Sequence, residues 1–149
     1  MANIIGIDPG ASGAIVVFRE SGSIFVIKMP PTPNEILQFL KLHSVNSFCF
    51  IEKVQGLPGN GGSAMFNFGK GYGHLEMALL ANKIPFETVT PQKWQPTYQL
   101  GTKGSQTTTE WKNKLKAKAE QLFPNQKVTL WNSDALLIAE YGRRILKTR

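Results

Sequence analysis

Two aspartates and one glutamate stand where an apolar run ends or a helix begins, a common position for active-site acids. Asp8 closes the strand-like run NIIGID, Glu52 closes SFCFIE, and Asp134 lies in the first turn of the last predicted helix. If the two strands are adjacent and parallel, Asp8 and Glu52 emerge at one sheet edge, where a packed helix would bring Asp134. Three neighbouring carboxylates need a cation to remain ionised, and oxygen ligands favour Mg²⁺ or Mn²⁺. A pair of such ions can support phosphodiester hydrolysis.

Each of these acids also has a simpler interpretation when it is considered alone. Asp8 precedes Pro9 and would suit a turn, and Glu52 would suit an exposed sheet edge. Asp134 would suit the positive end of a helix dipole. The order of the predicted elements favours the joint interpretation, because it places all three carboxylates at the same edge of a sheet.

The elements that would position these acids follow from apolar patterning and from turn and capping residues. Strands are expected over residues 3–8, 14–18, 24–28, 47–52 and 85–89. Helices are expected over residues 33–42, 64–82, 108–122 and 134–146. The first three strands would form an antiparallel meander, TPQKW is predicted to be a short capped turn, and QPTYQLGTKGSQ a flexible segment. This order predicts one α/β domain over residues 1–149, with a mixed sheet and helices on both faces.

Composition narrows the class of partner. Lys and Arg number 17 against 10 Asp and Glu, so the net charge is +7 and the pI is about 9.7. Such an excess favours polyanions such as nucleic acids. Cys49 is the only cysteine, which excludes a disulfide or a cysteine-based zinc site within one chain. No membrane span or signal peptide is apparent, so we expect a cytoplasmic protein.

The ordered motifs resemble RuvC-type Holliday junction resolvases, and more narrowly their phage and prophage branch. The resemblance rests on IGIDPG, FIEKVQG, SAMFNFGKGYG and DALLIAEYGRR, and it runs from Ile4 to about Arg144. It implies a ribonuclease H-like fold and a homodimer that nicks four-way DNA junctions with Mg²⁺ or Mn²⁺, within the cytoplasm of a bacterial host. It also implies that Asp8, Glu52 and Asp134 bind the metal, and that hydrolysis leaves 5′-phosphate and 3′-hydroxyl ends.

One position departs from the pattern of the family. Well-studied relatives carry another Asp or His three residues before the last aspartate, where this chain has Trp131. Asn132 could donate a carbonyl oxygen instead, although its place before a helix also suits a cap. Glu140 lies about 240° round the helix from Asp134 and should face elsewhere. The identity of a fourth metal ligand is therefore left open.

Residues that would hold DNA are expected in two regions. The glycine-rich segment from Lys53 to Phe68 combines a lysine with two aromatic rings, Phe66 and Phe68, which would stack on bases or else pack the helix against the sheet. Lys70 follows in the same region. Lys112 and Lys116 flank the apolar stripe of the helix over residues 108–122, which would also suit an ordinary solvated face. In the family a lysine lies near the scissile phosphate, and Lys103 and Lys112 are both candidates.

These features predict a metal-dependent, structure-selective endodeoxyribonuclease. Two other classes remain as alternatives. A protein that binds four-way junctions without cutting them is suggested by Trp131 at the expected ligand position. A sugar or acetate kinase is suggested by the Gly-Ile-Asp-x-Gly strand, but such enzymes enclose ATP between two such domains and this chain has room for one.

Overall fold

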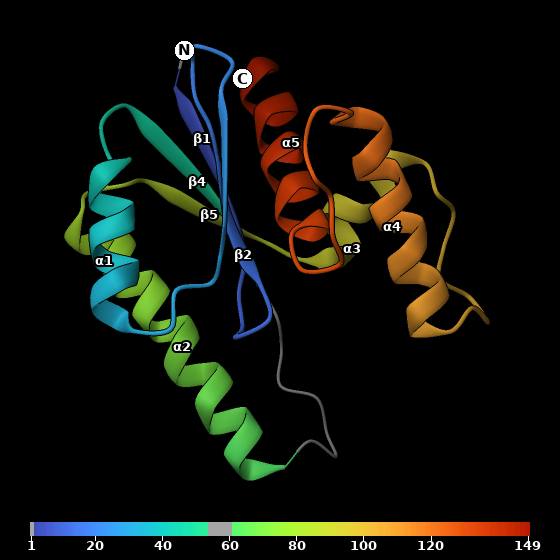
Figure 1. The fold of residues 1–149 in the computed structure, drawn as a ribbon, viewed down its shortest axis with the longest axis horizontal. Helices are drawn as coiled ribbons and strands as arrows, with labels where there is room; N and C mark the ends of the chain where they lie inside the picture. The colour runs from blue at the N-terminus through green and yellow to red at the C-terminus, as the bar shows by residue number, and fades with distance from the viewer. Residues whose placement is uncertain (1, 54–60) are drawn as a thin grey trace.

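A five-stranded mixed sheet forms the centre of the molecule in the computed structural model, which describes residues 2–53 and 61–149. Its strands are β1 (Asn3–Asp8), β2 (Ala14–Phe18), β3 (Ile24–Lys28), β4 (Ser47–Glu52) and β5 (Phe86–Val89). Their order is β3-β2-β1-β4-β5 (Figure 1). The first three strands are antiparallel, whereas β4 runs parallel to β1 and to β5. The predicted mixed sheet is confirmed.

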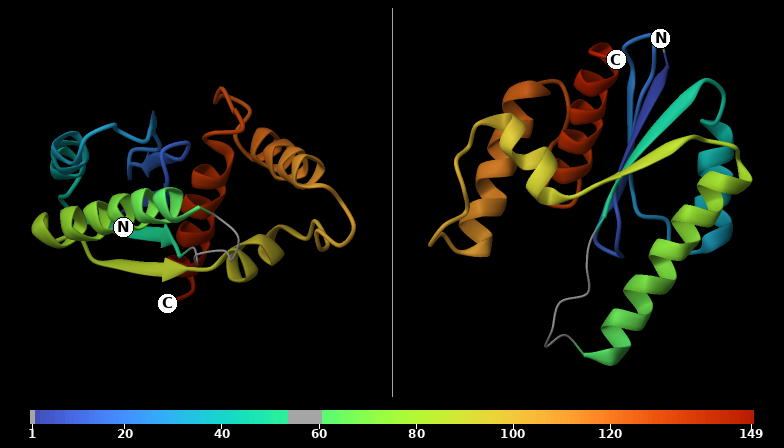
Figure 2. Two further views of the ribbon diagram at one scale, coloured as in Figure 1. Left: turned by 90° about the horizontal axis from the view of Figure 1, so that it is seen from below. Right: turned by 180° about the vertical axis from the view of Figure 1, so that it is seen from behind.

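Helices cover both faces of this sheet (Figures 1 and 2). They are α1 (Pro33–Leu42), α2 (Gly62–Ala81), α3 (Pro91–Trp94), α4 (Thr108–Leu122) and α5 (Ser133–Lys147), with a 3₁₀ helix, η1 (Gln95–Tyr98), directly after α3. The first two lie on one face, and α5 lies on the other with α3 and α4 beside it. Among the described residues, no helix is long and apolar enough to cross a membrane.

The alternating pattern of β1 explains why helices pack on both sides of it. Ile5 and Ile7 are fully buried in the apolar cluster under α1 and α2, whereas Ile4 belongs to the cluster under α5. Burying one such side chain contributes about 1.5–3 kcal/mol, so both faces of β1 are held firmly. The strand that ends at Asp8 therefore lies at the centre of two cores.

Two helices begin at the predicted caps. The hydroxyl of Thr32 accepts the backbone N–H of Glu35 at 3.2 Å, and that of Thr107 accepts the backbone N–H of Glu110 at 3.1 Å. The segment after Trp94 was expected to be flexible, and this prediction is wrong for its first four residues. They form η1, because Tyr98 is buried and donates its hydroxyl to the carbonyl of Leu137.

Gly6 allows α5 to approach β1 unusually closely. A Cβ atom at this position would lie 2.6 Å from the carbonyl oxygen of Ala135 and 2.6 Å from the backbone nitrogen of Ala139. These are backbone atoms, so no side-chain rotation can relieve the overlap. The close approach also sets the position of Asp134, which directly precedes Ala135 in α5.

We expect Gly6→Ala to reduce the free energy of unfolding by about 3 kcal/mol, because the new methyl group must push α5 away from β1. Urea unfolding followed by circular dichroism would measure the change. Gly73→Ala is the matched control, since a Cβ at this exposed position of α2 meets no atom within 4 Å. It should stabilise the helix by about 0.5–1 kcal/mol. Equal stability of the two variants would contradict the interpretation of Gly6.

Candidate active site

Parallel pairing of β1 with β4 brings two of the predicted acids to one edge of the sheet. Ile7 pairs with Ile51, so the next residues, Asp8 and Glu52, leave the two strands at the same edge. The start of α5 reaches this edge beside β1 and carries Asp134 there. Three residues that are far apart in the sequence thus converge at the carboxyl ends of two central strands.

The carboxylates are close enough for their charges to change the pKa values of Asp8 and Glu52. Burial, followed by repulsion from Asp134 and Glu52, raises the pKa of Asp8 well above its usual value. Burial is also the main cause that raises the pKa of Glu52 to about 7, with a further contribution from Asp134. The Lys112 ammonium opposes both increases. The positive charge of Lys112 is therefore not sufficient to keep the pKa values of Asp8 and Glu52 at their usual levels.

Lys112 of α4 is the one candidate lysine that the structure places directly against these acids. Its Nζ atom lies 2.8 Å from Oδ2 of Asp134, whose side chain is only 7% exposed. Burial lowers the pKa of Lys112, but Asp134, Asp8 and Glu52 raise it more, so the net shift is upward. Lys103 lies exposed in the segment before α4. The geometry thus distinguishes two lysines that the sequence left as equal candidates.

Trp94 is a site residue that the sequence analysis missed. Its indole Nε1–H donates a hydrogen bond of 2.7 Å to Oε2 of Glu52, and both side chains are buried. This bond orients the carboxylate and lowers the pKa of Glu52, partly offsetting the effect of burial. The interpretation of Glu52 as an exposed edge charge is wrong, because the residue is 7% exposed.

The donor set at this edge fits a hard divalent cation. It offers carboxylate oxygens only, which suit Mg²⁺ or Mn²⁺. Oδ1 of Asp134 is buried and has no hydrogen-bond partner, so one carboxylate oxygen is available to a cation. Within residues 2–53 and 61–149, however, no three acidic, histidine or cysteine side chains are close enough to form a complete set of ligands. Lys112, which is paired with Asp134, supplies positive charge at this place.

The two candidates for a further metal ligand are engaged elsewhere. Asn132 stands at the N-cap position of α5, but its side chain makes no capping hydrogen bond. Its amide is bonded to the preceding loop instead, accepting from Thr129 N at 2.8 Å and donating to Lys127 O at 3.0 Å. Glu140 forms ion pairs of 2.6 Å with Arg143 and 2.8 Å with Arg144. Either residue would have to give up these contacts to bind a metal ion, so the identity of a fourth ligand stays open.

Trp131, at the position where the resemblance would place another acid, has a packing role. Its ring lies against the apolar cluster under α5, and Nζ of Lys28 lies 5.3 Å from the ring centroid. An indole offers no oxygen to a metal ion. The structure therefore supplies no fourth carboxylate at this corner among the residues it describes.

An open hollow of about 530 Å³ borders Asp8. Asp8 and Lys112 line it together with the hydroxyl side chains of Ser12, Thr108 and Thr109. These hydroxyls, which the sequence analysis did not single out, are suitable donors to phosphate oxygens. A polyanionic chain entering this hollow would pass directly over Asp8.

The other DNA-binding candidates differ in their exposure. Phe66 is 69% exposed, so the expectation that it packs the helix against the sheet is wrong for this ring. Phe68 is half-buried, lines the hollow and is stacked on Tyr72 with ring centroids 6.4 Å apart. The remaining candidates extend from the surface as exposed or half-exposed lysines, and they are Lys53, Lys70, Lys103 and Lys116. Most of the glycine-rich segment, residues 54–60, lies outside the described residues.

We expect Glu52→Gln to stabilise the metal-free protein at neutral pH. The pKa of Glu52 rises from 4.5 to about 7 on folding, so between these values the folded state keeps a proton that the unfolded state has lost. The contribution of Glu52 to the free energy of unfolding is therefore fully present below about pH 4.5 and is lost as the pH rises to about 7. Glutamine has no charge and can still accept the Trp94 hydrogen bond.

The expected gain is about 2 kcal/mol in the free energy of unfolding near pH 8 in EDTA, with no gain near pH 4. Urea unfolding at the two pH values would measure it. Glu120→Gln is the control, because Glu120 lies exposed on α4, and it should change neither value. A Glu52→Gln protein that is no more stable than wild type near pH 8 would contradict the prediction.

Solved structures of RuvC from Thermus thermophilus have the same fold as this chain. The one titled "T. thermophilus RuvC in complex with Holliday junction substrate" has a TM-score of 0.64 at 15% identity, covering 97% of this chain and 96% of the other. A second, titled "Thermus thermophilus RuvC structure", has a TM-score of 0.60 at 17% identity and covers 96% of each chain. No family model and no curated protein matches the sequence. The predicted ribonuclease H-like fold is confirmed over nearly the whole chain.

Proposed function

We propose that this protein is a metal-dependent, structure-selective endodeoxyribonuclease that nicks four-way junctions or other branched DNA. The observation that carries the proposal is the convergence of Asp8, Glu52, Asp134 and Lys112 at one sheet edge, beside an open hollow. The RuvC fold of the chain supports the choice of branched DNA, because one RuvC structure contains a Holliday junction substrate. The net charge of +7 suits such a polyanion.

In this proposal Asp8, Glu52 and Asp134 together bind two Mg²⁺ or Mn²⁺ ions. When bound, such ions supply positive charge beside the phosphodiester and make water a stronger nucleophile. Trp94 fixes the orientation of Glu52 through its hydrogen bond. Asp134 reaches the site only because α5 lies so close to β1.

Lys112 has two successive partners in the proposed reaction. In the free protein its ammonium is paired with Oδ2 of Asp134. A phosphate entering the hollow offers a second anionic partner, so Lys112 would neutralise charge that develops on the phosphate oxygens in the transition state. The side chain is 43% exposed, so it is free enough to turn from the carboxylate toward DNA.

The proposal includes a homodimer, since a four-way junction presents two equivalent strands and resolution requires a cut in each. Two copies of the site would then act on one junction. Phe66, exposed on α2, is available to contact the unpaired bases of such a branch. The exposed lysines would contact backbone phosphates.

Nicking of labelled four-way junctions by the purified protein would test the function. We expect cuts that require Mg²⁺ or Mn²⁺, leave 5′-phosphate and 3′-hydroxyl ends, and are absent from a linear duplex of the same sequence. Binding in EDTA without any cut after metal is added would instead support the non-cleaving alternative. Failure to bind branched DNA in preference to linear DNA would overturn both.

A further inference from the structure

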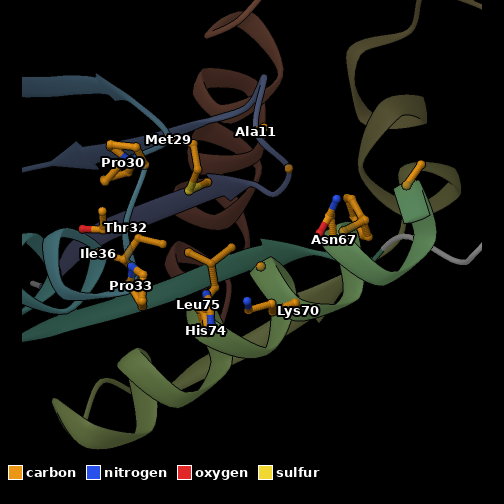
Figure 3. A pocket seen from close by; sticks show the side chains of 15 residues that line it. Ala11, Met29, Pro30, Thr32, Pro33, Ile36, Asn67, Lys70, His74 and Leu75 are labelled. Atoms are coloured by element: carbon orange, nitrogen blue, oxygen red, sulfur yellow. The ribbon is translucent and has the colours of Figure 1, made fainter. Parts of the chain in front are cut away.

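A hollow with two arginines in its wall lies apart from the candidate active site. The hollow beside Asp8 and a larger one of about 660 Å³ over α2 (Figure 3) have Gly10, Ala11 and Phe68 in common, so they form one region. The separate hollow has a volume of about 420 Å³, and none of the described residues that line it borders the other two. We call it the arginine hollow, and its lining includes Phe18, Ile24, Leu122, Phe123, Arg143 and Arg144.

The arginine hollow opens at the end of the sheet opposite to Asp8. Phe18 in its lining pairs with Ile4 near the start of β1, whereas Asp8 at the other end of β1 pairs with Ala14. The two pairs are four residues apart, or roughly 13 Å along the strand. The hollow lies between the turn after β2, the end of α4 and the second half of α5. A peptide-sized ligand bound there would leave the edge at Asp8 open.

Glu140 holds two guanidinium groups in place in this wall. Its carboxylate accepts hydrogen bonds from Nε and Nη2 of Arg143 at 2.7 and 2.6 Å, and from Nε of Arg144 at 2.8 Å. Burial raises the pKa of Glu140, but these two arginines lower it more, so the net shift is downward and the group is ionised at neutral pH. The Arg144 guanidinium also lies over the ring of Tyr98, with Cζ 5.1 Å from its centroid. Both guanidinium groups are thus fixed before any ligand arrives.

Both arginines keep donors for a ligand. A guanidinium has five N–H groups, and the bonds to Glu140 use two of them in Arg143 and one in Arg144. The two side chains are 37% and 41% exposed, whereas that of Glu140 is only 6% exposed. The ion pairs therefore bury the carboxylate and leave the remaining N–H groups accessible. Such groups match the geometry of an incoming carboxylate.

Apolar side chains line the hollow beside these cations. The rings of Phe18 and Phe123 are tilted against each other with centroids 5.4 Å apart. Phe18 is buried, whereas Phe123, Ile24 and Leu122 are half-buried. Half-buried apolar surface gains free energy when another apolar group covers it. A ligand of this hollow should therefore carry an apolar group next to its negative charge.

An acidic peptide has this combination of groups, and double-stranded DNA does not. A duplex presents phosphates, but its bases are stacked inside, so it has no apolar group to place on the two phenylalanine rings. A peptide can place an apolar side chain there and carboxylates on the arginines, as in the recognition of acidic motifs by arginine clusters. The net charge of +7 also favours an acidic partner.

We propose that the arginine hollow binds an acidic segment of a partner protein, with an apolar side chain on Phe18 and Phe123 and carboxylates on Arg143 and Arg144. This inference goes beyond the proposed nuclease function and does not depend on it. Because the hollow and Asp8 lie at opposite ends of the sheet, the partner and DNA can be bound at the same time. The partner would then recruit the protein without covering the candidate active site.

Fluorescence anisotropy of a labelled peptide, Gly-Glu-Asp-Phe-Asp-Glu-Gly, would test the proposal in EDTA at about 0.15 M salt, where long-range attraction is screened. We expect Arg143→Met to weaken binding about tenfold, because a charge-assisted hydrogen bond to the peptide is lost. Lys147→Met is the matched control, since Lys147 is exposed on α5, lies outside the hollow and loses the same charge. It should change the affinity less than about twofold. The same peptide with serine in place of phenylalanine should bind wild type about tenfold more weakly.

A second variant leaves the arginines intact. Ile24 is half-buried in the lining, so Ile24→Glu places a carboxylate in the hollow that competes with those of the peptide. We expect about tenfold weaker peptide binding. Ser23→Glu is its control, because Ser23 is the exposed neighbour outside the lining and gains the same charge. Its effect should be about twofold at most. Thermal unfolding of each variant verifies that the fold is retained.

Equal peptide binding by wild type, Arg143→Met and Ile24→Glu would overturn the proposal, and so would equal affinity of wild type for the two peptides. Displacement of the peptide by a linear DNA duplex would identify DNA as the occupant and would also overturn it. Selective weakening by Arg143→Met and Ile24→Glu in a protein that nicks no branched DNA would support the peptide site and reject the nuclease. Loss of peptide binding by Arg143→Met with nicking at the wild-type rate would support both sites as separate functions.

Discussion

Asp8→Asn should bind a four-way junction as well as wild type does but nick it at least about 10³-fold more slowly. Asparagine keeps the size and one oxygen of the aspartate, yet it removes one of the three negative charges that would hold the metal. Asp8 ends a strand whose side chains are buried on both faces of the sheet, so the position of its backbone is fixed. The loss should therefore fall on the rate and spare DNA binding.

Single-turnover nicking in Mg²⁺ and gel-shift binding in EDTA would measure the two effects separately. Loss of folding is not expected, because burial and the neighbouring carboxylates raise the pKa of Asp8 and so make its ionised form costly. The variant should be at least as stable as wild type at neutral pH in EDTA. Glu120→Gln removes an exposed acid and should nick normally. Normal cutting by Asp8→Asn would exclude this edge as the active site.

Lys112→Met should change metal affinity and nicking rate in opposite directions. In the free protein the Lys112 ammonium occupies Oδ2 of Asp134, so a divalent ion must compete with it. Methionine has a similar length without the charge, and we expect Mn²⁺ to bind the DNA-free variant about tenfold more tightly, which corresponds to about 1.4 kcal/mol. Nicking should fall about 10²-fold, because the charge that would face the phosphate is lost.

Binding linkage gives a second readout for Lys112. In the wild type, a DNA phosphate that draws Lys112 away from Asp134 should tighten Mn²⁺ binding. Lys112→Met has no ammonium to draw away, so DNA should affect its Mn²⁺ binding much less. Electron paramagnetic resonance of free Mn²⁺, with and without junction DNA, would measure both affinities. Lys116→Met is the control, since Lys116 lies one turn further along α4 and forms no ion pair in the structure's described residues. Equal Mn²⁺ affinities of the two variants would contradict the competition.

Local sequence patterns predicted the parts of the site that local structure determines. The apolar runs that end at Asp8 and Glu52 predicted both strands with their observed bounds, and the caps at Thr32 and Thr107 predicted two helix starts. Each of these features depends on residues only a few positions apart. Once β1 and β4 were expected to be parallel, their acids had to share an edge, because parallel strands end together.

Contacts between distant segments could not be predicted in this way. Trp94 meets Glu52 across 42 residues, and nothing in the short run around the tryptophan indicates that bond. The choice of Lys112 over Lys103 depends on how α4 is rotated against α5, which the alternating lysines do not specify. Tyr98 likewise orders a polar segment only because a carbonyl of α5 is within its reach.

The packing of α5 on β1 also has a consequence for the order in which the protein is made. The ribosome synthesises β1 well before α5, so one face of β1 has no partner until α5 has been made. Gly6 and Ala135 can meet only after almost all of the described chain has emerged. The three carboxylates are thus kept apart on the nascent chain until α5 has been made, and the proposed active site is completed only then.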